Sequence, residues 1–171
     1  MKFTIDRGAN FELEGLALML RNDRLEGPCT PRLDDGLGIA LNAPVEVTFS
    51  TEKKLEARDC RFLVCGASRF VYDTLGYGAN FADHVTFVAV DQLTHVVYSA
   101  GMEPNVQNPE APPSDLPRSA TDHSESTIGE YFRANLAEIM TLPAVETGYV
   151  VYAALGPHRS NTLTVKVVRR K

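Results

Sequence analysis

The sequence lacks any long apolar run. No window of its 171 residues approaches the roughly 20 apolar residues that a helix needs to cross a bilayer. Near the N-terminus, Asp6 and Arg7 interrupt the segment in which a signal peptide would have its apolar core. We therefore expect no membrane partner and a cytoplasmic location.

Cysteine is scarce as well, and the three cysteines, Cys29, Cys60 and Cys65, cannot all pair within one chain. Without a leader segment, reduced thiols are the expected state. If residues 60–65 form one strand, Cys60 and Cys65 point to opposite faces and are too far apart to bond to each other. A disulfide between Cys29 and one of them stays open.

Basic residues are not in excess. Lys and Arg number 17 against 22 Asp and Glu, which gives a formal net charge of -5. Proteins that bind DNA or RNA need Lys and Arg to neutralise phosphates, so we expect no nucleic-acid partner. The one compact basic cluster, formed by Lys166, Arg169, Arg170 and Lys171, is typical of a terminal strand with a charged edge.

What is present suits one folded domain. Apolar residues make up 44% and charged residues 23% of the chain, far from the composition of disordered proteins. A length of 171 residues is enough for one sizeable core and short for two. We predict a single domain over residues 1–171.

The clearest pattern lies near the C-terminus, where apolar side chains recur at every second position. A period of two is typical of strands with one face on a core, and it predicts strands at 149–155 and 162–168. A hairpin of 85–90 and 94–99, rich in β-branched and aromatic residues, is expected to be central in its sheet. Further predicted strands cover 3–5, 11–20, 45–50 and 55–65.

The segments between these strands predict loops. Residues 21–41 and 66–83 are rich in turn-forming residues, the second with at most one short element around residues 69–73. Residues 101–126 contain five prolines without periodicity, which predicts a long Pro-rich loop. Residues 127–140 fit two interpretations, because alternation favours a strand while 132–140 favour a helix. We choose a strand at 131–136, since tertiary context commonly overrides helix propensity.

About seven to nine short strands separated by turns predict an all-β chain folded as an antiparallel β-sandwich, with long loops and at most one short helix. Residues 142–168 resemble the last two strands of immunoglobulin-like and fibronectin type III-like domains. The resemblance implies that Tyr149 forms the tyrosine corner of such domains. The chain departs from the antibody pattern because it has no Trp, and because Cys60 and Cys65 lack the spacing of an inter-sheet pair.

No motif carries catalytic or metal-binding chemistry. The histidines His84, His95, His123 and His158 show no H-x-H or H-x-x-x-H spacing, and the cysteines form no C-x-x-C. The sequence also lacks a G-x-S-x-G nucleophile elbow, the third glycine of a phosphate-binding loop and the ligand spacing of an EF-hand. We predict no catalytic residue, no metal site and no cofactor.

Binding is the function that these patterns favour. We expect a non-catalytic interaction domain that contacts a protein partner, or a second copy of itself, through loops or edge strands. The candidate binding residues are Tyr72, Tyr77 and Phe81 in the glycine-rich loop, and Asp122 and His123 in the Pro-rich loop.

Two other functions stay open. A small hydrolase could use a metal ion on the same loops or a thiol such as Cys29. A carbohydrate-binding module could use the aromatic side chains of Tyr72 and Tyr77.

Overall fold

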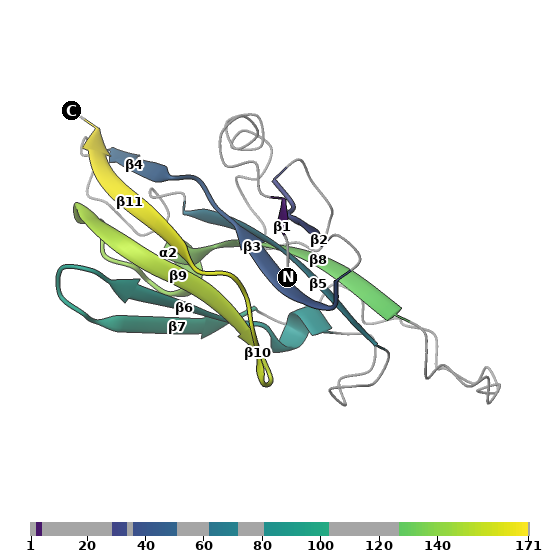
Figure 1. Ribbon diagram of the computed structural model, residues 1–171. Coiled ribbons are helices and arrows are strands. Elements are labelled where there is room, and N and C mark those ends of the chain that lie inside the picture. The colour runs from purple at the N-terminus through teal and green to yellow at the C-terminus, as the bar shows by residue number, and fades with distance from the viewer. Residues whose placement is uncertain are drawn as a thin grey trace, which may run out of the picture.

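The computed structural model describes residues 3–4, 29–33, 36–50, 62–71, 81–102 and 127–170 of the chain. They form an all-β sandwich of two sheets, as the alternation predicts (Figure 1). The predicted strand at 11–20, residues 55–61 of another and residues 103–126 of the Pro-rich loop lie outside the described part. No helix of the described residues is long and apolar enough to cross a membrane.

The larger sheet contains five strands and a short extension. In spatial order these are β4 (Glu46–Ser50), β11 (Leu163–Arg170), β9 (Thr147–Leu155), β6 (Thr86–Asp91) and β7 (Val97–Gly101), and β10 (His158–Arg159) pairs with β9. The smaller sheet orders β3 (Gly38–Asn42), β5 (Leu63–Val71) and β8 (Thr127–Asn135). A separate pair joins β1 (Phe3–Thr4) to β2 (Arg32–Leu33).

The two strands predicted near the C-terminus are confirmed. β9 and β11 are antiparallel neighbours, with Val151 opposite Leu163 and Tyr149 opposite Val165. The alternate residues that face the other sheet are buried in both strands, because a strand turns successive side chains to opposite faces. These buried residues are Tyr149, Val151, Ala153, Leu155, Leu163, Val165 and Val167.

Among the described strands, one pair of neighbours is parallel and the others are antiparallel. β4 pairs with β11 in parallel, with Val47 beside Val167. β4 follows β3 after only residues 43–45, yet β3 belongs to the smaller sheet. The chain therefore crosses from one layer to the other and reaches the edge of the larger sheet in the same direction as β11. Side-chain alternation does not reveal strand direction.

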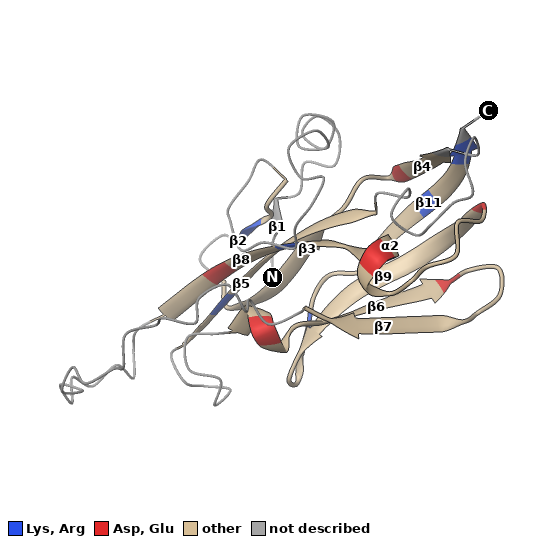
Figure 2. Ribbon diagram, turned by 180° about the vertical axis from the view of Figure 1, so that it is seen from behind, with Lys and Arg blue, Asp and Glu red and all other residues tan. Residues whose placement is uncertain are grey.

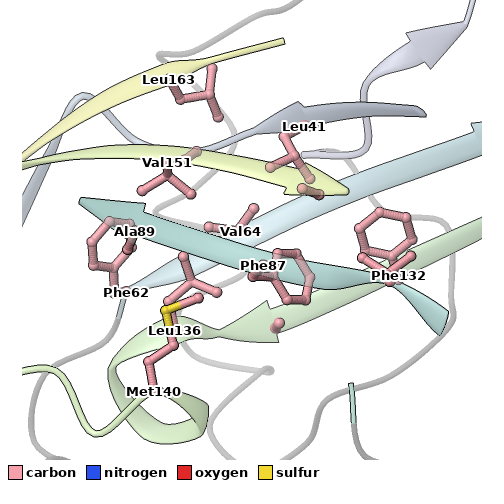
Figure 3. Close-up of a cluster of buried hydrophobic side chains, with 14 of the residues drawn as sticks. Leu41, Phe62, Val64, Phe87, Ala89, Phe132, Leu136, Met140, Val151 and Leu163 are labelled. Atoms are coloured by element: carbon pink, nitrogen blue, oxygen red, sulfur yellow. The ribbon is translucent and has the colours of Figure 1, made fainter. Parts of the chain in front are cut away.

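Aromatic rings from both sheets meet in the core (Figure 3). The ring centroids of Phe87 in β6 and Phe132 in β8 lie 5.8 Å apart, and those of Phe62 and Tyr149 lie 5.9 Å apart, both edge to face. All four side chains are fully buried. Aromatic pairs of this geometry add about 0.5–1.5 kcal/mol to what their burial contributes.

Gly66 lies inside a strand, which corrects the prediction that a loop begins at this residue. β5 continues through Gly66 to Val71, and Gly66 pairs with Phe132 of β8. A Cβ atom at Gly66 would overlap the ring of Phe132. Glycine is therefore needed here because the Phe132 ring lies close to the backbone, and it does not mark a turn.

Both interpretations of residues 127–140 hold in part. β8 covers Thr127–Asn135, so the choice of a strand at 131–136 is confirmed for all but its last residue. The helix-forming residues that follow make α2 (Leu136–Ile139), the one α-helix of the described residues. Tertiary pairing with β5 outweighs helix propensity up to Asn135.

The hairpin exists, and its predicted central position is confirmed for β6 and wrong for β7. β6 lies inside the larger sheet between β9 and β7, whereas β7 forms the edge of that sheet among the described strands. β6 ends at Asp91, one residue later than predicted, and β7 begins at Val97, three residues later. Residues 92–96 form the connection between them.

A disulfide bond joins Cys29 to Cys65, so the expectation of free thiols is wrong for these two residues. Cys65 lies on the face of the smaller sheet that points away from the core, next to Arg133 of β8. The Asn42 side-chain amide donates a hydrogen bond to the Cys29 carbonyl oxygen at 2.9 Å. The segment that contains Cys29 therefore covers this outer face. Cys60 lies outside the described residues.

Asn161 ties the two sheets together between β10 and β11. Its Oδ1 accepts a hydrogen bond from the Leu41 backbone N–H at 2.8 Å, and its Nδ2 donates to the Leu41 carbonyl at 3.0 Å. The side-chain amide thus takes the place of a neighbouring strand at the edge of β3. This arrangement satisfies backbone groups that would otherwise be left at that edge.

Candidate functional site

Of the five residues predicted for binding, the described part of the chain contains Phe81 alone. Tyr72, Tyr77, Asp122 and His123 lie outside the described residues. Phe81 is described, and it is fully buried in η2 (Phe81–His84).

The Phe81 ring packs against the core, which corrects its assignment to a binding surface. Its centroid lies 5.4 Å from the centroid of Phe70 in β5. Buried apolar side chains of this kind stabilise the fold and are not accessible to a ligand.

The described residues hold no group suited to bind a metal ion. No three His, Cys, Asp or Glu side chains of this part of the chain are close enough to form such a site. His84 and His95 are exposed and lie on separate elements, and the ring of His158 packs against Phe70 at 4.8 Å.

A thiol enzyme based on Cys29 is ruled out while the disulfide is present. The nucleophile of such enzymes is a thiolate, and the sulfur of Cys29 is bonded to that of Cys65. Both cysteines are also completely buried.

The most distinctive surface of the described chain is the edge formed by β7. Among the described strands, β7 pairs with β6 alone. Val97 is 62% exposed, and Ser99 and Gly101 on the same face are exposed too. At the adjoining turn, Leu93 is 75% exposed and Val96 46%. We call these five residues the β7 edge surface.

The backbone of β7 has hydrogen-bonding groups directed outward. Asp91 N–H donates to the Val96 carbonyl at 2.9 Å, and Met102 N–H donates to the Val85 carbonyl at 3.3 Å. In an antiparallel ladder, residues alternate between bonding to one side and to the other. Because residue 96 and every second residue after it bond to β6, the N–H and C=O groups of Val97, Ser99 and Gly101 point away from β6.

The β7 edge surface carries no charge. Natural sheets commonly protect an exposed edge with charged side chains, which oppose pairing with another strand. At the opposite edge of the same sheet, β4 has Glu46, in register with Lys166 of β11. Figure 2 shows β6 and β7 in tan, apart from an acidic segment at the end of β6.

The outer face beside β7 is uncharged as well. Val90 of β6 lies between Val97 of β7 and Val150 of β9, and Val88 lies between Ser99 and Tyr152 in the next row. Together with the β7 edge surface, these two rows form an area without charged residues that crosses β7, β6 and β9.

A charged side chain first appears at the end of these rows. The Arg159 guanidinium lies over the Tyr152 ring, 3.5 Å from its centroid. Such a cation–π contact holds Arg159 against the sheet at the boundary of the uncharged area.

The turn that precedes β7 is held by Asp91. Its carboxylate is almost fully buried, and Oδ1 accepts hydrogen bonds from Leu93 N–H at 2.7 Å, Thr94 N–H at 3.0 Å and the Thr147 hydroxyl at 2.9 Å. Because Thr147 begins β9, the carboxylate links the turn to the centre of the sheet. It thereby fixes where β7 starts.

The same contacts set the pKa of Asp91. Burial alone would raise the pKa of this carboxyl group, but the hydrogen bonds from the backbone of Thr94 and Leu93 and from the Thr147 hydroxyl outweigh burial. The pKa of Asp91 therefore lies below its ordinary value. These contacts stabilise the ionised form.

Replacing Asp91 should destabilise the hairpin in a pH-dependent way. The folded-state pKa is lowered, so the carboxylate contributes stability above its unfolded pKa of about 3.9, and this stability is lost as the pH falls through the folded pKa. We expect Asp91→Ala to lower the free energy of unfolding at pH 7 by about 2–3 kcal/mol. Urea unfolding monitored between neutral and acidic pH measures both effects.

Asp91→Asn isolates the charge, because the amide keeps an acceptor oxygen at the same place. This variant should unfold more easily at pH 7 and converge with the parent protein at low pH. Glu138→Gln, at an exposed site on α2, is the matched control. A parallel pH dependence of the parent protein and the Asp91→Asn variant would show that Asp91 is not the responsible group.

Comparison with known proteins leaves the function open. No family model, curated protein or solved structure matches this chain. The β7 edge surface is therefore the feature of the described chain that bears on function.

The β7 edge surface was not predicted from the sequence, because the hairpin was expected in the centre of the sheet. The one available signal was the absence of charge over residues 96–101. That signal is ambiguous, because both buried and exposed strands can lack charge.

Proposed function

We propose that the chain is a non-catalytic interaction domain that binds a protein through the β7 edge surface. The observation that carries the proposal is an exposed edge strand with outward-directed backbone groups and no protective charge. Adding a strand to such an edge is a common way in which proteins bind extended segments of other proteins. Main-chain hydrogen bonds then supply affinity, and the exposed aliphatic side chains supply contact area.

The proposed domain is immunoglobulin-like. In variable-type immunoglobulin domains one sheet contains the neighbouring strands G, F, C and C′, of which G is the last in the chain. The spatial order β11, β9, β6 and β7 matches this arrangement, because β11 is also the last strand and β6 and β7 are consecutive. Tyr149 supports the comparison, because it is buried at the start of the penultimate long strand and contacts the Phe62 and Tyr98 rings.

The disulfide differs from the antibody arrangement. It connects β5 to a preceding segment on the outer face of the sheet and does not join the two sheets. The proposed domain is therefore an immunoglobulin-like sandwich with its own stabilising link.

The Cys29–Cys65 disulfide also bears on where the domain works. Disulfides persist in oxidising compartments and are rare in the cytosol, where thiols are kept reduced. The bond supports an oxidising compartment as the working location, in contrast to the cytoplasmic location expected from the sequence.

A photo-crosslinking amino acid tests the proposed function. Placed at Val97 and activated in the cells that make the protein, it should yield a covalent protein adduct. The same group at Thr48, an exposed residue on the opposite edge strand, should yield little or none. The mass of the adduct identifies the partner. Equal labelling from both positions, or none from Val97, would refute the proposal.

A further inference from the structure

The geometry points to a second copy of this chain as the partner of the β7 edge surface, paired antiparallel through β7 of both copies. This inference deepens the proposed function and rests on it. It starts from the outward-directed N–H and C=O groups of Val97, Ser99 and Gly101. A strand with these groups on one side can pair with an identical strand about a two-fold axis, which is the commonest symmetry of protein dimers.

All three outward-directed residues can pair when the two-fold axis passes between the two copies of Ser99. Ser99 then lies opposite Ser99 of the second copy, and Val97 lies opposite Gly101 of the second copy. Residues that face each other in this way exchange two hydrogen bonds and have Cα atoms about 5.5 Å apart. The two larger sheets become one continuous sheet, and both β7 edges are covered.

Side-chain sizes are complementary in this register. On the exposed face, the branched side chain of Val97 meets Gly101, which has no side chain. On the other face, the half-buried Tyr98 meets Ala100. Each off-centre pair thus combines a large residue with a small one, and the two equal residues at the axis are serines. Cross-strand pairs are the unit in which sheets gain stability.

The absence of charge at this edge is compatible with a second copy as the partner, although the whole chain is acidic. Each chain carries a formal net charge of -5, so two copies repel each other at long range. The β7 edge surface and the neighbouring rows of Val88 and Val90 carry no charge. Two copies can therefore meet here without bringing like charges together.

A dimer formed by one strand pair should be weak. Stable interfaces bury about 1,200–2,000 Å², which is more than two five-residue strands and the adjoining Leu93 and Val96 provide. Sedimentation analysis from about 1 μM to about 1 mM should show reversible dimerisation in the upper part of this range. A strict monomer throughout would overturn the inference.

Substitution at the axis gives the sharpest test. Ser99→Glu places two carboxylates opposite each other and should weaken the dimer about 100-fold, because like charges at an interface cost several kcal/mol. Thr48→Glu introduces the same charge on the other edge strand and should leave dimerisation unchanged. Equal effects of the two variants would overturn the inference. Unchanged circular dichroism spectra verify that both variants are folded.

Ser99→Cys tests the register itself. In a Cys60→Ser background, oxidised glutathione should convert the two introduced thiols of a dimer into an intermolecular disulfide and be reduced to two glutathione molecules. Thr48→Cys is the matched control and should remain monomeric on a non-reducing gel. Crosslinked dimer at both positions, or at neither, would contradict the proposed pairing.

The two proposals can fail separately. An adduct from Val97 with a different protein, together with a strict monomer in sedimentation, would leave the interaction domain in place and refute the second copy as partner. Dimerisation in solution without any adduct from Val97 in cells would refute the proposed function.

Discussion

Removal of the Cys29–Cys65 disulfide is expected to lower the free energy of unfolding by about 4 kcal/mol. The bond closes a loop with a sequence separation of 36 residues. A crosslink of this span reduces the conformational freedom of the unfolded chain, and the chain-entropy relation for loops of this length gives the quoted magnitude. This loss is a large part of the stability of an ordinary domain.

Packing adds to the effect of the bond. Ala40, Cys65 and Ala67 lie on the outer face of the smaller sheet, yet each is at most 1% exposed. The segment that carries Cys29 helps to cover this face through the disulfide and the hydrogen bond from Asn42. When the bond is lost, this cover is held less firmly, and small apolar residues gain access to water.

Urea unfolding of the Cys29→Ser/Cys65→Ser double variant measures the loss. The matched control is Cys60→Ser, which leaves the bond intact and should unfold like the parent protein. Addition of a dithiol reductant during unfolding should shift the Cys60→Ser midpoint towards that of the double variant. If the double variant matches the parent in stability, the bond does not support the fold as inferred.

Gly66→Ala is expected to destabilise the protein by about 3 kcal/mol, although the change adds a single methyl group. Gly66 lies in β5, directly opposite Phe132 of β8, and the new Cβ atom would overlap the Phe132 ring. The ring cannot withdraw easily, because it is fully buried and also packs edge to face against Phe87. Overpacking of a dense core forces side chains or backbone to move.

Gly129→Ala is the matched control for this substitution. Gly129 is also a strand glycine, but a Cβ atom there would lie 3.6 Å from the Ser68 carbonyl oxygen, an ordinary contact. Its effect on thermal unfolding should stay within about 0.5 kcal/mol. Similar losses for the two variants would show that strand glycines in general, and not the Phe132 ring, determine the effect.

A double-mutant cycle with Phe132→Leu identifies the cause directly. Leucine lacks the flat ring that lies over Gly66, so Gly66→Ala should cost less in this background. We expect a coupling energy of about 1–2 kcal/mol between the two positions. Additive effects would indicate that Gly66 is required for a reason other than this ring.

Local pattern was enough to predict part of the fold. β9 and β11 follow from the apolar residues at every second position between Tyr149 and Val167, because one face of each strand must be buried. β4 was predicted in the same way and β6 from its β-branched and aromatic residues, and the all-β class followed from these strands. The absence of metal-binding and catalytic spacing similarly directed attention to binding.

Predictions about position in the sheet failed for a physical reason. The place of β7 at an edge depends on which strands pair with it, and β9, the other neighbour of β6, lies more than 50 residues further along the chain. The candidate site is a consequence of this order. Of the binding residues predicted in loops, Tyr72, Tyr77, Asp122 and His123 lie outside the described residues, and Phe81 is a core residue.

The sequence by itself thus determined the strands whose burial pattern is local, and the class of fold that they make. Only the tertiary structure decided that Gly66 makes room for the Phe132 ring of the neighbouring strand, that Cys29 bonds to Cys65 and that β7 lies at an uncharged edge. The physical reason is the same in each case. Alternation records which face of a strand is buried, whereas strand order and side-chain contacts depend on residues far away in the chain.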